Sequence, residues 1–310
     1  MAFPVSLTPA HIAPVTIQHV NYHGWSDALR LSNGLVEAIV VPQIGRVMRF
    51  QFVGQPQTDP LYEDPYWAGK TGADTDLESW ANFGGDKLWP SPQSTWPGGF
   101  WPPDKAFDGD PFYVQAIPNG VRLISPGSLP FAARAFRSIT MRPGQTRLYF
   151  DQKLVKDAHA PKPFPIGVWT ITQVRGDGTV SIPTIPIASQ PNGFLSLSDV
   201  GVTEAAPYYQ LTDQTLRIVR DPVKSHKISA WPSTGVISFH YGSGLTFSEH
   251  FTPPAPGASY APNEQPTEVY AAGGKPGYFE LEILGPLSSL NPGESAALSV
   301  YWQLYRTPHR

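Results

Sequence analysis

The sequence predicts an all-β fold of antiparallel strands, and three observations carry this prediction. Short runs rich in β-branched and aromatic residues recur along the whole chain and end at Gly, Pro, Asn or Asp. The 35 prolines and 28 glycines are spread between these runs, as in many short strands joined by structured loops. The apolar spacing of an amphipathic helix is absent, apart from one short turn expected near residues 75–80.

The chain is expected to form a single domain over residues 1–310. Neither an internal repeat nor a shift in composition marks a boundary within it. A hydrophobic content of 41% excludes a disordered chain, and 310 residues can bury a large core.

The composition also argues against two classes of binding partner. The net charge is −3 and no Lys/Arg cluster occurs, so we expect neither nucleic acid nor an anionic membrane as a partner. No apolar stretch approaches the length of a membrane span. The start, MAFPVSLTPAHIAPV, lacks the features of a signal peptide. The compartment is left open: a soluble protein in the cytoplasm, or in the periplasm or exterior after removal of a signal. The oligomeric state is left open.

Several chemistries lack their sequence signatures. With no cysteine, the chain has no disulfide, thiol nucleophile or thiolate metal site. Metal-ligand spacings, a phosphate loop, a dinucleotide fingerprint and a nucleophile elbow are also missing. We therefore expect no metal and no organic cofactor.

The first strand pair is predicted within LSNGLVEAIVVPQIGRVMRFQFVG. Val36 to Val41 form one strand, a turn follows from Pro42 to Gly45, and a second strand begins after it.

The stretch NFGGDKLWPSPQSTWPGGFWPPD is predicted to be a long, rigid loop, because Pro removes backbone donors and Gly adds chain entropy. It contains three tryptophans, Trp89, Trp96 and Trp101. In one interpretation they are preorganised platforms that stack on sugar rings, with Asp86 and Lys87 supplying charged hydrogen bonds. In the other, they fill one end of the fold as a small second core.

Near the other end, EVYAAGGKPGYFELEILGPL is predicted to be a β-hairpin with its turn at Gly273 to Gly277. Strand alternation puts the glutamates on one face and Phe279, Leu281 and Ile283 on the other. If the hairpin closes symmetrically, two cross-strand pairs follow: Glu268 opposite Glu282, and Tyr270 opposite Glu280.

This crowding of carboxylates allows two interpretations. Like charges placed opposite each other destabilise a sheet, so either the carboxylates point into water or they line a polar ligand groove. In the groove, mutual repulsion is expected to raise the pKa of one carboxyl, as an acid or base working near neutral pH requires.

Three segments carry a resemblance to a known superfamily. NGLVEAIVVPQIGRVMRFQFVG looks like the opening of galactose-mutarotase-like proteins, and YFELEILGPLSSLNPGESAALSVYWQLYR is similar to their closing strands. WANFGGDKLWPSPQSTW followed by WPPD resembles most the uncharacterised DUF4380-type branch of that superfamily.

The resemblance implies a β-supersandwich with a sugar-sized cleft on one concave face, acting on a small-molecule carbohydrate. It also implies chemistry like that of aldose 1-epimerases, without metal or cofactor. There an acid protonates the ring oxygen while a base takes the proton of the anomeric hydroxyl, and the sugar ring opens and recloses.

Site residues follow from the resemblance position by position. Arg46 matches a Gly-Arg turn that directs an Arg into the cleft. Asp86, Lys87 and Trp89 stand where mutarotases carry a His-Gly segment, and Trp169 and Gln173 stand where they carry a His-Pro-Tyr-Phe strand.

The sequence thus nominates two sets of residues. The catalytic candidates are Glu268, Glu280 and His250, the last lying in a late strand, TFSEHF; Lys87 and Tyr270 are alternative acids. The candidates for substrate binding are Arg46, Asp86, Lys87, Trp89, Trp101, Trp169, Gln173, Tyr270 and Glu282.

The leading hypothesis is a carbohydrate-active protein that epimerises a free or modified sugar. The alternatives are a non-catalytic carbohydrate-binding protein and, third, an accessory domain of a lyase or hydrolase. An acid and a base on opposite sides of the cleft would distinguish the epimerase from the non-catalytic binding protein.

Overall fold

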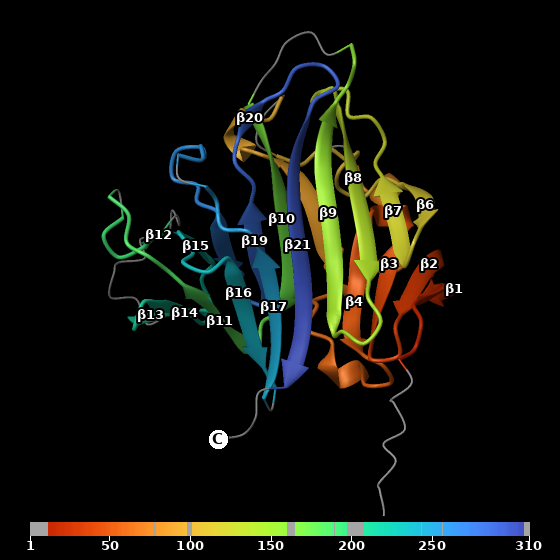
Figure 1. The fold of residues 1–310 in the computed structure, drawn as a ribbon, viewed down its shortest axis with the longest axis horizontal. Coiled ribbons are helices and arrows are strands. Elements are labelled where there is room, and N and C mark those ends of the chain that lie inside the picture. The colour runs from red at the N-terminus through yellow and green to blue at the C-terminus, as the bar shows by residue number, and fades with distance from the viewer. Residues whose placement is uncertain are drawn as a thin grey trace, which may run out of the picture.

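The computed structural model describes residues 12–76, 79–97, 101–159, 165–188, 190–196, 208–242, 244–255 and 257–306. Within these ranges the chain forms antiparallel sheets, which confirms the predicted fold class (Figure 1). The helices there are 3-10 turns of three residues: η1 (Pro42–Ile44), η2 (Pro56–Thr58), η3 (Pro65–Trp67), η4 (Gly72–Asp74) and η5 (Gln93–Thr95). The turn expected near 75–80 falls partly outside the described residues, which omit 77 and 78.

The first sheet has four strands in chain order: β1 (Thr16–Tyr22), β2 (Trp25–Ser32), β3 (Val36–Val41) and β4 (Arg46–Phe52). Strand β3 has the predicted bounds. The turn η1 joins it to β4 and ends at Gly45, whose φ of 66° lies in the left-handed region. A Cβ on Gly45 would come within 2.5 Å of the Phe112 ring, so this turn needs glycine.

The second sheet has seven strands. Six follow the order β12 (Phe194–Ser196), β15 (His226–Ala230), β18 (Thr267–Ala271), β19 (Tyr278–Leu284), β10 (Pro165–Arg175) and β20 (Ser288–Ser289). The seventh, β5 (Asp86–Ser91), pairs with β10.

The third sheet has ten strands and runs across Figure 1 from β13 at the left to β6 at the right. Its order is β13 (Tyr209–Thr212), β14 (Thr215–Ile218), β11 (Gly178–Pro183), β16 (Val236–Tyr241), β17 (Leu245–Phe251), β21 (Ser295–Arg306), β9 (Arg147–Lys156), β8 (Ala133–Met141), β7 (Gly120–Ile124) and β6 (Tyr113–Ile117).

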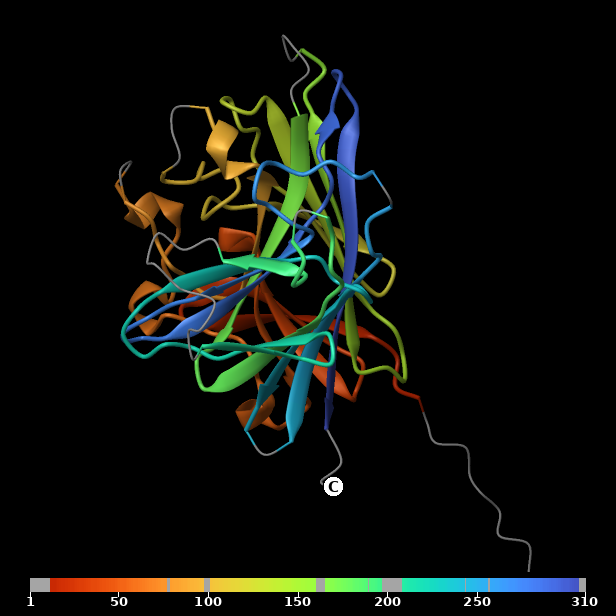
Figure 2. The ribbon, with the colours of Figure 1, turned by 90° about the vertical axis from the view of Figure 1, so that its left-hand side faces the viewer.

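Both smaller sheets pack on the inner face of the ten-stranded sheet (Figure 2). Phe279 of β19 contacts Phe239 of β16, with ring centroids 6.1 Å apart, and Phe50 of β4 lies 6.4 Å from Phe247 of β17. Phe239 and Phe247 are cross-strand partners, so both contacts are made on one face. One hydrophobic cluster extends through all three sheets.

Three buried ionisable groups interrupt this core. Arg137 of β8 forms an ion pair with Asp86 of β5, and both side chains are almost fully buried. Glu249 of β17 is wholly buried, and this burial, reinforced by the charge of Asp86, raises its pKa to about 8.

Asp86 therefore lies between the layers rather than beside a ligand. One of its carboxylate oxygens pairs with Arg137, and the other accepts a hydrogen bond from the Val47 amide at 2.6 Å. From the sequence, Asp86 and Lys87 were both expected to supply charged hydrogen bonds to a ligand. Because β5 is a strand, consecutive side chains point to opposite faces of the sheet, and only Lys87 faces away from the core.

Candidate functional site

The hairpin of β18 and β19 has the predicted register. Glu268 is opposite Glu282, and Tyr270 is opposite Glu280. The alternating side chains Phe279, Leu281 and Ile283 are fully buried against the interlayer core. The glutamates therefore lie on the face of the seven-stranded sheet that points away from the ten-stranded sheet.

Glu280 is held by a lysine from β5 and an amide from β10. Lys87 Nζ lies 2.8 Å from Glu280 Oε1, and Gln173 Nε2 donates a hydrogen bond to the same oxygen at 2.8 Å. Burial by itself would raise the pKa of Glu280, but the charge and hydrogen bond of Lys87 outweigh it and hold the pKa below its usual value. Glu280 is thus kept ionised near neutral pH.

A second lysine joins the other two glutamates. Lys227 Nζ of β15 lies 2.6 Å from Glu268 Oε2 and 2.9 Å from Glu282 Oε2. The indole Nε1 of Trp169 also donates to Glu282 Oε2, at 2.8 Å. We call Lys87, Lys227, Glu268, Glu280 and Glu282 the glutamate–lysine cluster.

Within the cluster, the pKa values of Glu280 and Glu282 are shifted in opposite directions. Burial, together with repulsion from Glu268 and Glu280, raises the pKa of Glu282 to about 8 against the opposing charge of Lys227. Burial would lower the pKa of Lys227, but Glu282 and Glu268 raise it above its usual value. The crowding in the hairpin predicted a raised carboxyl pKa from mutual repulsion, but burial is its largest cause.

Several buried oxygen atoms of the cluster and of the adjacent Gln173 lack a hydrogen-bond partner among the described residues. They are Glu268 Oε1, Glu282 Oε1 and Gln173 Oε1. Buried polar atoms are normally paired, so these atoms leave hydrogen-bonding capacity for a polar ligand at this face.

Lys227 was not among the predicted residues. It reaches the cluster because β15 pairs with β18, which puts Lys227 opposite Tyr270. About forty residues separate the two positions in the chain, and a pairing across such a distance leaves no local sequence signal.

The aromatic segment differs from its prediction in one respect. Asp86–Ser91 is a strand rather than part of a loop. It pairs only with β10 among the described residues, and such an edge position tolerates Pro90 because one side of the strand needs no donor. Residues 98–100 of the segment lie outside the described part.

The three tryptophans of this segment have different environments. Trp89 and Trp96 are buried, with ring centroids 5.5 Å apart, and Trp89 lies equally close to Trp169. This arrangement favours the small second core for these two residues. Trp101 is 51% exposed and lies 5.1 Å from Trp80, so it keeps a free surface.

Lys87 connects the aromatic residues with the glutamates. Its Nζ lies 4.5 Å from the centre of the Trp89 ring and 4.9 Å from that of Trp80. Tyr278, stacked on Tyr62 at 4.9 Å, lies beside Tyr270 on the other side of Glu280.

Arg46 is buried behind the cluster. Its guanidinium pairs with Asp108 and donates to the Gly84 carbonyl at 2.8 Å, and Asp108 also accepts from Trp80 Nε1 at 2.7 Å. The resemblance implied that Arg46 is directed into the cleft. The charge of Glu280 acts on its guanidinium, but its ion pair and hydrogen bonds are made with Asp108 and Gly84 and support the aromatic residues next to Lys87.

His250 lies elsewhere. It is on β17 of the ten-stranded sheet, stacks on Tyr301 at 4.4 Å, and bonds to Ser248 Oγ at 2.8 Å. Its cross-strand partner Tyr301 points to the same face of the sheet as His250. The next residue, Trp302, points to the opposite face and packs inward on Phe150, so His250 faces outward. His250 was nominated as a catalytic candidate together with Glu268 and Glu280, but it lies on a different sheet from them, because sequence proximity does not imply a shared sheet.

The stacking interpretation of the aromatic segment predicts that Trp101→Ala weakens sugar binding by about 1–3 kcal/mol while leaving the melting temperature nearly unchanged, because an exposed ring contributes stacking area but little core. Titrations that follow tryptophan fluorescence would measure the binding. Tyr113→Ala, which removes a still more exposed aromatic ring on β6, is the control. Equal affinities for Trp101→Ala and the unaltered chain would contradict a stacking role.

Comparison with known proteins supports the fold. Neither a family model nor a curated protein matches the chain. Among solved structures, a candidate aldose 1-epimerase from Escherichia coli K12 aligns with a TM-score of 0.60 at 13% identity, over 94% of this chain and 99% of that one. A galactose mutarotase-like protein from Lactobacillus casei aligns with a TM-score of 0.54 at 8% identity, over 90% and 100%.

A longer structure matches as well. It is a TPR-domain containing protein from Parabacteroides distasonis, with a TM-score of 0.56 at 13% identity. The alignment covers 91% of this chain but only 48% of that protein, so the chain spans about half of its length.

The architecture is therefore that of the galactose-mutarotase-like β-sandwich proteins, as the sequence resemblance implied. At these identities the likeness defines the fold. In the described part of the chain, no helix is long and apolar enough to cross a membrane. No group of three or more His, Cys, Asp or Glu residues there is arranged to hold a metal ion.

Proposed function

We propose that this protein is a carbohydrate-active epimerase that opens and recloses a free or modified sugar at the glutamate–lysine cluster. The observation that carries the proposal is the contrast between two glutamates on one strand. Lys87 keeps Glu280 ionised, while burial keeps Glu282 protonated to about pH 8. Carboxyls whose environments drive their pKa values apart are typical of acid–base sites.

The proposed roles follow from this contrast. Glu280, which Lys87 keeps ionised, accepts the proton of the anomeric hydroxyl, while protonated Glu282 delivers a proton to the ring oxygen. The bond between the anomeric carbon and the ring oxygen breaks, an aldehyde forms, and rotation followed by the reverse transfers gives the other anomer. Lys87 and Glu268, whose Oε1 has no hydrogen-bond partner among the described residues, bind hydroxyl groups, and Lys227 positions Glu282.

A second candidate function is non-catalytic sugar binding. One observation favours it: Glu268 and Glu282 are only 2% and 0% exposed, and both are tied to Lys227. Such a cluster could hold hydroxyl groups without exchanging protons.

Exchange spectroscopy by NMR separates the two functions. Under the epimerase proposal the protein accelerates anomer exchange of at least one aldose, and Glu280→Gln or Glu282→Gln abolishes this while sugar binding and fold persist. Glu294→Gln, at an exposed turn, is the matched control. If no aldose in a broad panel shows faster exchange but binding is weakened by the same substitutions, the protein is a binding protein and the catalytic proposal fails.

A further inference from the structure

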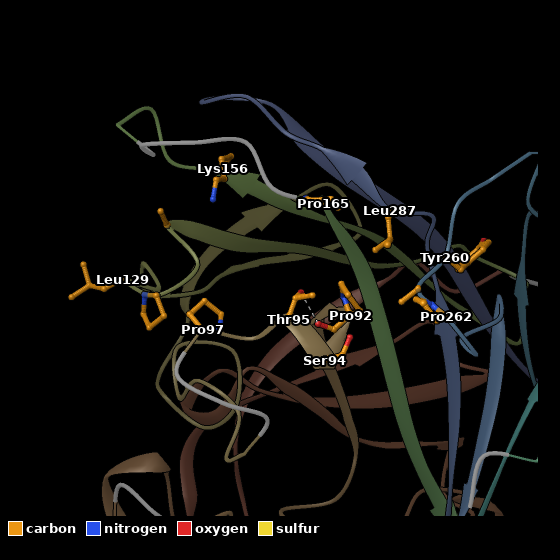
Figure 3. A pocket seen from close by; sticks show the side chains of 13 residues that line it. Pro92, Ser94, Thr95, Pro97, Leu129, Lys156, Pro165, Tyr260, Pro262 and Leu287 are labelled. Carbon is orange, nitrogen blue, oxygen red and sulfur yellow. Dashed lines mark hydrogen bonds between the residues drawn. The ribbon is translucent and has the colours of Figure 1, made fainter.

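The loop between β17 and β18 carries a carboxyl group that the proposed function does not use. Tyr260 and Pro262 of this loop line one end of a cavity of about 730 Å³ near the start of β10 (Figure 3). Glu264, two residues further along, interacts instead with the glutamate–lysine cluster, since the charges of Glu268 and Lys227 act on its carboxyl group. Its Oε2 atom is buried and has no hydrogen-bond partner among the described residues.

A buried hydroxyl group lies next to Glu268. Ser229 of β15 is the cross-strand partner of Glu268, and it points to the same sheet face as Lys227, two residues before it on the strand. Ser229 is fully buried, and its Oγ has no hydrogen-bond partner in the described part of the chain. The same holds for Glu268 Oε1. Around Glu268, one oxygen atom each of Glu264, Glu268 and Ser229 can therefore accept a hydrogen bond.

The lysines of the cluster, in contrast, already use their donors. Lys87 Nζ lies 2.8 Å from Glu280 Oε1, and 4.9 and 4.5 Å from the centres of the Trp80 and Trp89 rings. An ammonium group has three N–H donors, and the face of an indole ring attracts a cation. These three partners enclose Lys87, whose side chain is only 1% exposed.

Lys227 is enclosed in the same way. Its Nζ lies 2.6 Å from Glu268 Oε2, 2.9 Å from Glu282 Oε2 and 5.0 Å from the centre of the Trp169 ring. Neither lysine thus has a donor left for a phosphate or carboxylate group of a ligand. The face offers acceptors rather than donors to whatever binds there.

These acceptors also lack positive charge. Glu264 and Glu268 share one cation, Lys227, which in addition contacts Glu282. A sugar hydroxyl donates one hydrogen bond and leaves the carboxylate charge uncompensated, whereas an ammonium group supplies three donors and a positive charge. An ammonium group therefore matches the three unpartnered oxygen atoms in number and in charge.

We propose that the ligand of the cluster is an amino sugar, whose ammonium group takes the place of one hydroxyl and donates hydrogen bonds to Glu264, Glu268 and Ser229. The inference rests on the proposed function, since it takes the cluster as the sugar site. It adds the class of the substrate: an amino aldose with a free anomeric hydroxyl, as ring opening requires, rather than a neutral or anionic sugar.

Calorimetry with paired sugars tests the proposal. The probes are D-glucosamine, D-galactosamine, D-mannosamine, 3-amino-3-deoxy-D-glucose and 6-amino-6-deoxy-D-glucose, each compared with its parent hexose, and D-glucuronate as an anionic sugar. We expect at least one amino sugar to bind about tenfold or more tightly than its parent, because its hydrogen bonds join a cation to carboxylates. D-glucuronate should bind more weakly than that amino sugar.

Two variants locate the ammonium group. Glu264→Gln should bring the ratio of the two affinities below about threefold, because the charge partner is lost, and Ser229→Ala should lower it by about twofold or more, because one acceptor is lost. Glu294→Gln, at an exposed turn, is the matched control and should leave the ratio intact. Circular dichroism would confirm that each variant is folded.

Proton release gives a second measurement. Burial, with repulsion from Glu268, raises the pKa of Glu264 to about 7 against the opposing charge of Lys227, so this carboxyl is mostly protonated at pH 6. A bound ammonium group favours the carboxylate, so binding at pH 6 should release up to about one proton. Calorimetry in buffers of different ionisation enthalpy measures this release, which Glu264→Gln should largely remove.

Three results would overturn the amino sugar proposal while leaving the epimerase proposal standing. They are equal affinities of every amino sugar and its parent, tighter binding of D-glucuronate than of any amino sugar, and an affinity ratio or proton release that persists in Glu264→Gln.

Failure of the proposed function has a different signature. If an amino sugar binds with the expected ratio but NMR shows no faster anomer exchange for it or for its parent, the epimerase proposal fails and the ammonium site stands. If neither the amino sugars nor the parent hexoses bind, the cluster is not a sugar site and both proposals fail.

Discussion

Arg137→Met is expected to lower the free energy of unfolding by about 3–5 kcal/mol, since it leaves a buried carboxylate without its counter-charge. Arg137 is fully buried between the sheets. It pairs with Asp86, donates to the Gly45 carbonyl at 2.6 Å, and donates through Nε to Gln152 Oε1 at 2.9 Å. Methionine fills much of the volume but replaces none of these bonds. Urea denaturation followed by circular dichroism would measure the loss.

A second variant distinguishes the uncompensated charge from lost packing. Adding Asp86→Asn to Arg137→Met removes the buried charge, so the double variant should recover part of the lost stability. Arg134→Met is the matched control, because Arg134 is half-exposed on the same strand and lies 3.9 Å from Asp157; a change within about 0.5 kcal/mol is expected. A loss below about 1 kcal/mol for Arg137→Met would show that the pair contributes little.

Glu249→Gln is expected to stabilise the protein at alkaline pH, with little effect at pH 4.5. Burial raises the pKa of Glu249 to about 8, against a usual value of 4.5. Between these values the folded chain keeps a proton that the unfolded chain releases. The free energy of unfolding therefore falls as pH rises, by up to ~1.4 kcal/mol per pH unit from this group.

Glutamine cannot ionise, so the variant escapes this loss, and its advantage over the unaltered chain should grow to several kcal/mol by pH 8–9. Urea midpoints measured from pH 4.5 to 9 would show the two curves diverging. Glu294→Gln is the control, because hydrogen bonds from Asn291 lower the pKa of that exposed carboxyl and place its titration below this window. Parallel curves for Glu249→Gln and the unaltered chain would mean that Glu249 is ionised in the fold.

Buried charge also explains which of the nominated residues the structure brings together. Lys87, Gln173 and Trp169, nominated for substrate binding, contact the glutamates, because all three lie on one face of β5 and β10. Asp86 and Arg46, nominated with them, are instead tied to Arg137 and Asp108 inside the molecule. Residue type indicates that a charge needs a partner, but which partner depends on the packing of the sheets.

The sequence by itself determined the all-β class, the strands β3 and β19, and the register of the β18–β19 hairpin. These are local properties: alternation at a period of two and a glycine-rich turn specify which side chains share a face and which stand opposite each other. The pairing of Glu268 with Glu282 and of Tyr270 with Glu280 follows from them directly.

Only the tertiary structure decided that residues 86–91 form the strand β5, which pairs with β10. The same holds for Lys227, which bridges two of the glutamates, and for His250, which faces outward from a different sheet. Each of these depends on which distant strands are neighbours, and long-range pairing is set by the sum of many buried contacts. The raised pKa of Glu282 has the same origin, since the burial that causes it exists only once β5, β10, β15 and β18 surround the strand.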